Sequence, residues 1–72
     1  MKGMTMTHFN NAIAAYLNAR DCLKQGRKLE ADRYDEMAQT FCRWHVKEVG
    51  GNYLDAYLGM VAEAVGYYKK AA

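Results

Sequence analysis

The sequence predicts an all-α protein of three helices, in which an antiparallel helical hairpin carries a third, more hydrophobic helix. Two observations support this fold class. The 72-residue chain has no proline, and Gly26 and the pair Gly50–Gly51 interrupt segments whose apolar residues recur with the helical period. Because helices commonly end at glycine, this punctuation divides a single domain into three helical segments.

The first helix is expected over about residues 8–25, after a flexible N-terminal segment of residues 1–7. Thr7 is its candidate N-cap, and Gly26 is expected to end it in the left-handed conformation. One arc of this helix is apolar and consists of Phe9, Ala12, Ile13, Tyr16, Leu17, Ala19 and Leu23. The opposite side is polar, so we expect an amphipathic helix that packs on one neighbour.

The second helix is expected over about residues 29–49. Its apolar arc is made of Tyr34, Met37, Ala38, Phe41, Trp44 and His45. Because only a short link around Gly26 separates the first two helices, they should form an antiparallel hairpin.

The third helix is expected over about residues 53–70, with Asn52 as its N-cap. Its large apolar residues span about 180°, whereas packing on one neighbour requires an apolar stripe of about 100°. An aliphatic sector contains Leu54, Leu58, Val61 and Val65, and a tyrosine-methionine sector contains Tyr53, Tyr57, Met60, Tyr67 and Tyr68. We expect the aliphatic sector to close the monomer and the tyrosine-methionine sector to contact another chain, because Tyr and Met are enriched at interfaces.

A protein-binding function follows from this surplus of apolar surface. A monomer of this size hides only about 60% of the surface that its unfolded chain exposes, so we expect a homodimer, built as a dimeric helical bundle. Arg20 and Trp44 are further candidate interface anchors. The leading hypothesis is a stoichiometric protein-binding module or inhibitor. By analogy of size and class alone, it could be a phage or mobile-element protein that sequesters a host protein.

Nucleic-acid binding is the alternative function. Four basic residues, Arg20, Lys24, Arg27 and Lys28, gather near the turn between the first two helices and could contact phosphates. The net charge is only +2, which neither requires nor excludes a polyanionic partner. The alternative is therefore a dimeric nucleic-acid-binding regulator.

Other classes of function have weaker support in the sequence. Catalysis is not expected, because the spacing shows no nucleophile, base and orienting group, and there is no glycine-rich phosphate loop. No cofactor and no metal are expected, since His8, Cys42 and His45 fall short of the usual four zinc ligands; their convergence is left open. No apolar run reaches the roughly 18 residues of a membrane span. We therefore expect a cytoplasmic protein whose two cysteines remain thiols.

Overall fold

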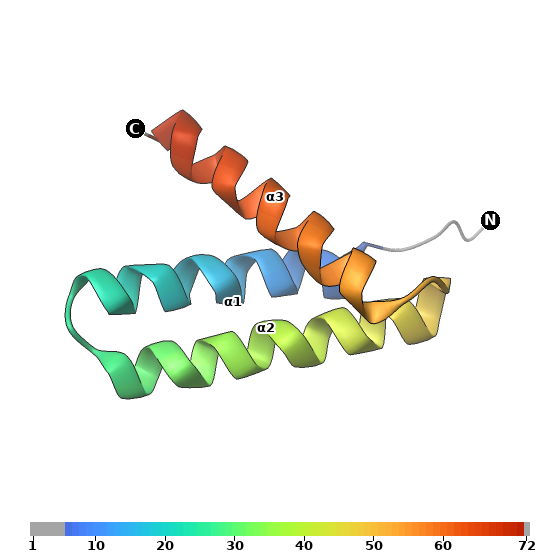
Figure 1. Ribbon diagram of the computed structural model, residues 1–72, viewed down its shortest axis with the longest axis horizontal. Helices are drawn as coiled ribbons and strands as arrows, with labels where there is room; N and C mark the ends of the chain where they lie inside the picture. Colours follow the sequence, from blue (N-terminus) through green and yellow to red (C-terminus); the bar gives the residue numbers. More distant parts are fainter. Residues whose placement is uncertain (1–5, 72) are drawn as a thin grey trace.

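The computed structural model describes residues 6–71, apart from the side chains of Tyr68, Lys70 and Ala71. It consists of α1 (Thr7–Lys24), α2 (Lys28–Val49) and α3 (Tyr53–Ala71), as Figure 1 shows. The all-α, three-helix prediction is confirmed, and each helix limit lies within one residue of the expected one. Residues 1–5 of the expected flexible segment lie outside the described residues.

The start of α1 differs from the prediction. Met6 occupies the N-cap position and makes no side-chain capping hydrogen bond. The backbone carbonyl of Met6 accepts a 2.8 Å hydrogen bond from the N–H of Asn10, so Thr7 already lies inside the first helical turn. The prediction of Thr7 as N-cap is therefore wrong.

The turn between α1 and α2 is a Schellman motif. The N–H of Arg27 donates to the carbonyl of Cys22 at 2.8 Å, and the N–H of Gly26 donates to the carbonyl of Leu23 at 3.1 Å. Gly26 adopts a φ of +75°, a conformation that costs other L-residues about 1 kcal/mol or more. This confirms Gly26 as the residue that ends α1 and reverses the chain.

The start of α3 confirms Asn52 as its N-cap. The Asn52 Oδ1 accepts a 2.9 Å hydrogen bond from the backbone N–H of Asp55, and the Asn52 Nδ2 donates to the Asp55 carboxylate at 3.0 Å. These reciprocal bonds satisfy one of the otherwise unpaired N–H groups of the first helical turn. They begin α3 directly after the glycine pair.

Small side chains line the contact between α1 and α2. The buried residues of this hairpin are Ala12, Ile13, Ala15, Ala19 and Cys22 of α1 and Ala31, Ala38 and Cys42 of α2. Such short side chains allow two helix axes to approach at the near end of the usual 8–10 Å range. Alanine and cysteine therefore occupy most of the buried positions, and the partly buried side chains of Phe9, Tyr16, Leu17 and Phe41 pack against the same core.

Several large residues lie outside the contact between α1 and α2. Met37 and Trp44 lie in the predicted apolar arc of α2, yet they are 46% and 48% exposed, and Leu23 of α1 is also exposed. The expected burial of Met37 and Leu23 is therefore wrong, whereas Trp44, the predicted interface anchor, is accessible to solvent. The physical reason is that the alanine and cysteine positions form the contact line, which leaves bulkier side chains at its edges or outside it.

The third helix lies across the hairpin and then leaves it. Figure 1 shows α3 crossing near the start of α1 and the end of α2, with its C-terminal half running away from both helices. Met60 and Ala64 are fully buried in the same core cluster as Ala12, Ala38 and Cys42. These two residues therefore attach α3 to both helices of the hairpin.

Burial does not divide the two sectors of α3 as expected, since Val61 of the aliphatic sector also packs against the core and Tyr67 of the tyrosine-methionine sector is 51% exposed. Met60 is 0% exposed and Tyr53 and Tyr57 are half-buried against the core, whereas Leu54 and Leu58 are 62% and 57% exposed. A tyrosine ring can pack on a core while its hydroxyl reaches water, and the flexible Met side chain fills an irregular gap. The prediction that the aliphatic sector closes the monomer is therefore wrong.

Candidate protein-interaction surfaces

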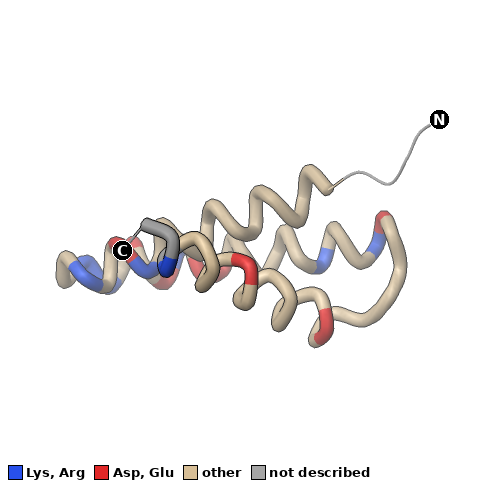
Figure 2. Tube along the Cα trace, turned by 90° about the horizontal axis from the view of Figure 1, so that it is seen from above, with Lys and Arg blue, Asp and Glu red and all other residues tan. Residues whose placement is uncertain are grey.

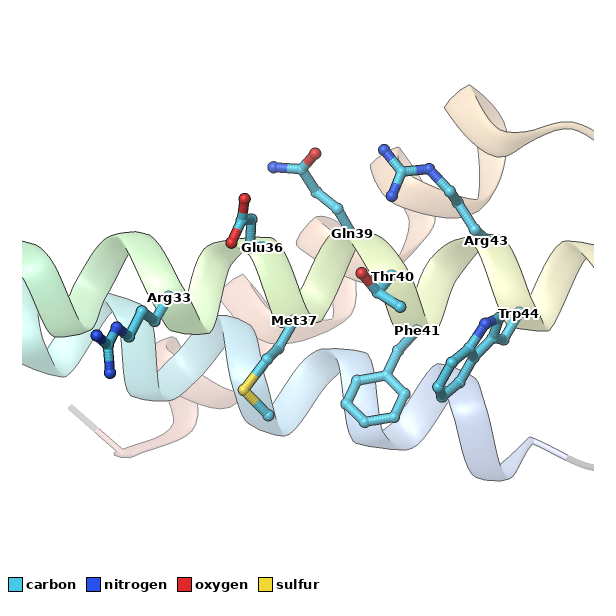
Figure 3. Close-up of a pocket in the computed structure, with 8 residues that line it drawn as sticks. All are labelled: Arg33, Glu36, Met37, Gln39, Thr40, Phe41, Arg43 and Trp44. Atoms are coloured by element: carbon cyan, nitrogen blue, oxygen red, sulfur yellow. The ribbon is translucent and has the colours of Figure 1, made fainter.

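An open cavity of about 650 Å³ lies on α2, on a surface that we call the Trp44 surface. Its lining residues all come from α2 and are Arg33, Glu36, Met37, Gln39, Thr40, Phe41, Arg43 and Trp44 (Figure 3). Figure 3 shows the side chains of Met37, Phe41 and Trp44 on one side of the helix axis, with Glu36, Gln39 and Arg43 on the other. The surface thus combines an apolar row with a polar, partly cationic row.

Aromatic contacts hold Trp44 in place. Its ring lies edge-on to Phe41 at a centroid distance of 5.6 Å and to His8 of α1 at 5.4 Å. His8 in turn lies 6.4 Å from Phe41, and its Nε2 is 3.8 Å from a carboxylate oxygen of Glu48. One face of the indole is therefore supported by the hairpin, while nearly half of the side chain remains open to solvent.

The residue types of this surface are typical of binding hot spots. Tryptophan and arginine are over-represented among residues whose truncation weakens protein complexes, and Met and aromatic residues are enriched in interface centres. A supported but exposed Trp44 loses little conformational freedom on binding. The arrangement suits an apolar anchor of a partner with acidic groups near Arg33 and Arg43.

A second exposed surface runs along α3, on the side away from the hairpin. We call it the α3 outer face and define it by Leu54, Leu58, Ala62 and Val65, with Asp55 and Lys69 near its ends. All six residues are exposed, and Val65 is 41% exposed. Figure 2 shows the acidic residues in the earlier part of α3 and a basic residue near its C-terminus.

The predicted interface residues Tyr53 and Tyr57 contribute to attaching α3. Their rings stack at a centroid distance of 5.9 Å, and the Arg43 guanidinium lies 5.3 Å from the centre of the Tyr53 ring. Burial raises the pKa of both phenols, and the Coulomb effect of Asp35 raises the pKa of Tyr57 further. The Arg43 charge partly opposes this effect for the pKa of Tyr53.

The remaining predicted interface residues are scattered. Met60 is fully covered by the hairpin, so a partner could contact it only if α3 moved. Tyr67 is exposed, and the side chain of Tyr68 lies outside the described residues. Arg20 is exposed and borders a separate cavity of about 290 Å³ beside Tyr57. The structure therefore does not bring the predicted set together with Trp44 on one surface.

The four basic residues proposed for nucleic-acid contact are all exposed near the turn between α1 and α2. Arg27 and Lys28 pair with acidic residues of α2. The guanidinium of Arg27 lies 3.1 Å from a carboxylate oxygen of Glu30. This contact raises the pKa of Arg27 and lowers the pKa of Glu30. The ammonium group of Lys28 lies 3.4 Å from a carboxylate oxygen of Asp32. Figure 2 shows basic and acidic residues interleaved at this end of the hairpin. These carboxylates reduce the positive potential available to a phosphate.

The candidate metal ligands are packed among aromatic rings. His45 lies 5.1 Å from the Phe9 ring, and Cys42 is fully buried, which raises the pKa of its thiol. Within residues 6–71, no group of three or more His, Cys, Asp or Glu side chains is placed to hold a metal ion. The buried Nδ1 atoms of His8 and His45 have no hydrogen-bond partner. Cys22 and Cys42 are both unpaired, buried thiols.

Comparison with known proteins adds no functional assignment. No protein-family model, curated protein sequence or solved structure matches this chain. A search of the described helices for a segment long and apolar enough to cross a membrane finds none.

Sequence reasoning named Trp44 as an interface anchor but missed the rest of the Trp44 surface and the α3 outer face. Met37 and Trp44 share a side of α2, and Leu54, Leu58 and Val65 share a side of α3, so both apolar groupings were visible in the sequence. The sequence signal that could have revealed these surfaces is the seven-residue spacing of alanines in each hairpin helix, Ala12 with Ala19 and Ala31 with Ala38. That spacing predicts where the hairpin contact lies and therefore which large residues remain outside it.

Proposed function

We propose that this chain is a non-catalytic, stoichiometric protein-binding module, and that the Trp44 surface is its target site. The observation that carries the proposal is the exposure of Trp44 and Met37 on α2, which packs against α1, with Arg33 and Arg43 among the residues that line the same cavity. The partner is a protein segment that presents an apolar anchor flanked by carboxylates. Such a segment would cover the indole and neutralise Arg33 and Arg43.

An inhibitory or regulatory role is the form of this activity that suits a chain of 72 residues. Binding without turnover requires only an accessible, preorganised surface, and Phe41 and His8 supply the support for Trp44. The proposal places the chain in a reducing compartment such as the cytoplasm, which keeps Cys22 and Cys42 as thiols. The small size also suits a mobile-element protein that sequesters a host protein.

The test compares three proteins: the wild type, the double variant M37D/W44A, and a matched variant L54D that alters the α3 outer face. Each is immobilised on beads, exposed to lysate of the native host, and the captured proteins are identified and purified. We expect one target to be captured by the wild type and L54D and lost by M37D/W44A. Titration of that purified target should then quench or shift Trp44 fluorescence and saturate at a fixed stoichiometry.

Two outcomes would refute the proposal. In the first, M37D/W44A keeps the native circular dichroism spectrum and captures the same target as the wild type. In the second, the captured target binds without any change in the emission of Trp44, which is the only tryptophan of the chain.

A further inference from the structure

We infer that the α3 outer face binds a second copy of this chain, with the two α3 helices antiparallel and their twofold axis near Ala62. This goes beyond the protein-binding function proposed above, because it uses a different helix face and a different partner. Its failure would leave the Trp44 surface untouched.

The spacing of exposed residues on α3 is that of a helix-pairing seam. Asp55, Leu58, Ala62, Val65 and Lys69 follow one another at alternating intervals of three and four, an average of 3.5 residues. All five are exposed, and at 100° per residue they lie opposite Met60 and Ala64, which attach α3 to the hairpin. A second helix can therefore lie along this seam without contacting either hairpin helix of the first copy.

Charge complementarity determines the direction of the pair. Ala62 lies midway between Asp55 and Lys69 in the sequence, so an antiparallel pair centred there brings Asp55 of each copy opposite Lys69 of the other. A parallel pair would instead place Asp55 against Asp55 and Lys69 against Lys69. Opposed helix dipoles also favour the antiparallel arrangement. Because the arrangement is twofold symmetric, each attractive contact occurs twice and the assembly closes as a dimer.

The same register gives the two glycines inside α3 a position beside the seam. It places Leu58 of one copy opposite Gly66 of the other, and Val65 opposite Gly59. A Cβ atom built at either glycine would meet nothing within 4 Å in the monomer, although glycine weakens a helix interior relative to alanine. At 100° per residue the two glycines lie about 60–80° from the midline of the seam, so they flank the contact and keep its border free of side chains.

The size of the seam sets the expected affinity. A helix of 19 residues is about 28 Å long, and one pair of such helices buries less than the roughly 800 Å² per partner of a standard-size interface. We therefore expect a dissociation constant in the micromolar range and a monomer–dimer equilibrium. Leu54, at the edge of the seam, adds apolar area to it.

Sedimentation equilibrium of the full chain tests the surface. The wild type should dimerise reversibly, L58E should be monomeric over the same concentrations with unchanged helicity, and the control M37E should dimerise as the wild type does. K69E should weaken the dimer about tenfold at low salt, because it replaces two modest ion pairs by repulsive ones, and the effect should shrink at high salt.

Cysteine cross-linking tests the direction. Under mild oxidation A62C should form a disulfide-linked dimer, because Ala62 lies near the twofold axis, whereas V65C should not. The wild type, with its buried Cys22 and Cys42, is the background control. Cross-linking of both variants would show a parallel pair, and cross-linking of neither would show that this seam is not the contact. A wild type that stays monomeric at several hundred micromolar, or an L58E variant that still dimerises, would also overturn the inference.

Discussion

Replacement of Met60 by alanine measures how strongly the hairpin holds α3. Among the described residues, Met60 has the largest fully buried side chain, and it is enclosed by core residues that include Ala12, Ala38 and Cys42. Removing a buried Met side chain costs about 2–5 kcal/mol, depending on how far the surroundings collapse into the space. Alanine neighbours have no side-chain rotamers with which to fill a cavity, whereas α3 can shift as a body. We therefore expect a loss of about 3 kcal/mol.

This loss is a large share of the total stability. A domain of 72 residues is expected to unfold with a free energy of about 4–10 kcal/mol. The matched control is L58A, which removes a side chain that is mostly exposed and replaces it with a residue of at least equal helix propensity. The control should change the free energy of unfolding by less than about 0.5 kcal/mol.

Urea denaturation is the assay, followed by circular dichroism and by Trp44 fluorescence at micromolar protein concentration or below. At these concentrations self-association contributes little. The midpoint of M60A should fall by about 2–3 M, since a chain of this size has a urea slope near 1 kcal/mol/M. The burial reasoning is refuted if M60A loses less than about 1 kcal/mol, or if L58A loses as much as M60A.

Three further predictions concern the turn, the core thiol and the tyrosines. The variant G26A should lose about 1 kcal/mol in urea denaturation because Gly26 has a φ of +75°, and equal stability to wild type would argue against the Schellman turn. In a C22S background, the thiol of Cys42 should react with Ellman's reagent only as fast as the chain opens, since it is 0% exposed and its pKa is raised by burial; rapid labelling of the folded protein would contradict this. Burial raises the folded-state pKa values of Tyr53 and Tyr57 above 10, so their contribution to stability is fully present below pH 10 and is lost as the pH rises through the folded-state values. The melting temperature of the wild type should therefore fall above pH 10. The melting temperature of the variant Y53F/Y57F should fall less over the same pH range.

The candidate interaction surfaces could be predicted only in part. The sequence showed that α3 carries more apolar circumference than one contact can cover, and the structure leaves Leu54, Leu58 and Val65 exposed. The sequence did not reveal which of two adjacent stripes would be covered, because the tyrosine-methionine stripe and the aliphatic stripe have the same helical spacing. Trp44 was named as an anchor, but its neighbours Met37 and Arg33 were not, because Met37 was assigned to the core.

The local signals in the sequence determined the three helices and their ends. Gly26 and Asn52 act through backbone conformation and hydrogen bonds to residues at most five positions away, so their effects can be inferred without knowing what packs on them. The tertiary structure alone decided which side of each helix is covered. That choice depends on how closely α1 and α2 approach, and the approach depends on small residues of both helices meeting, such as Ala12 and Ala38 in one core. A prediction of the buried face from the hydrophobicity of a single helix depends most on its large side chains. The distance at which two helices pack, in contrast, is set by the smallest side chains between them.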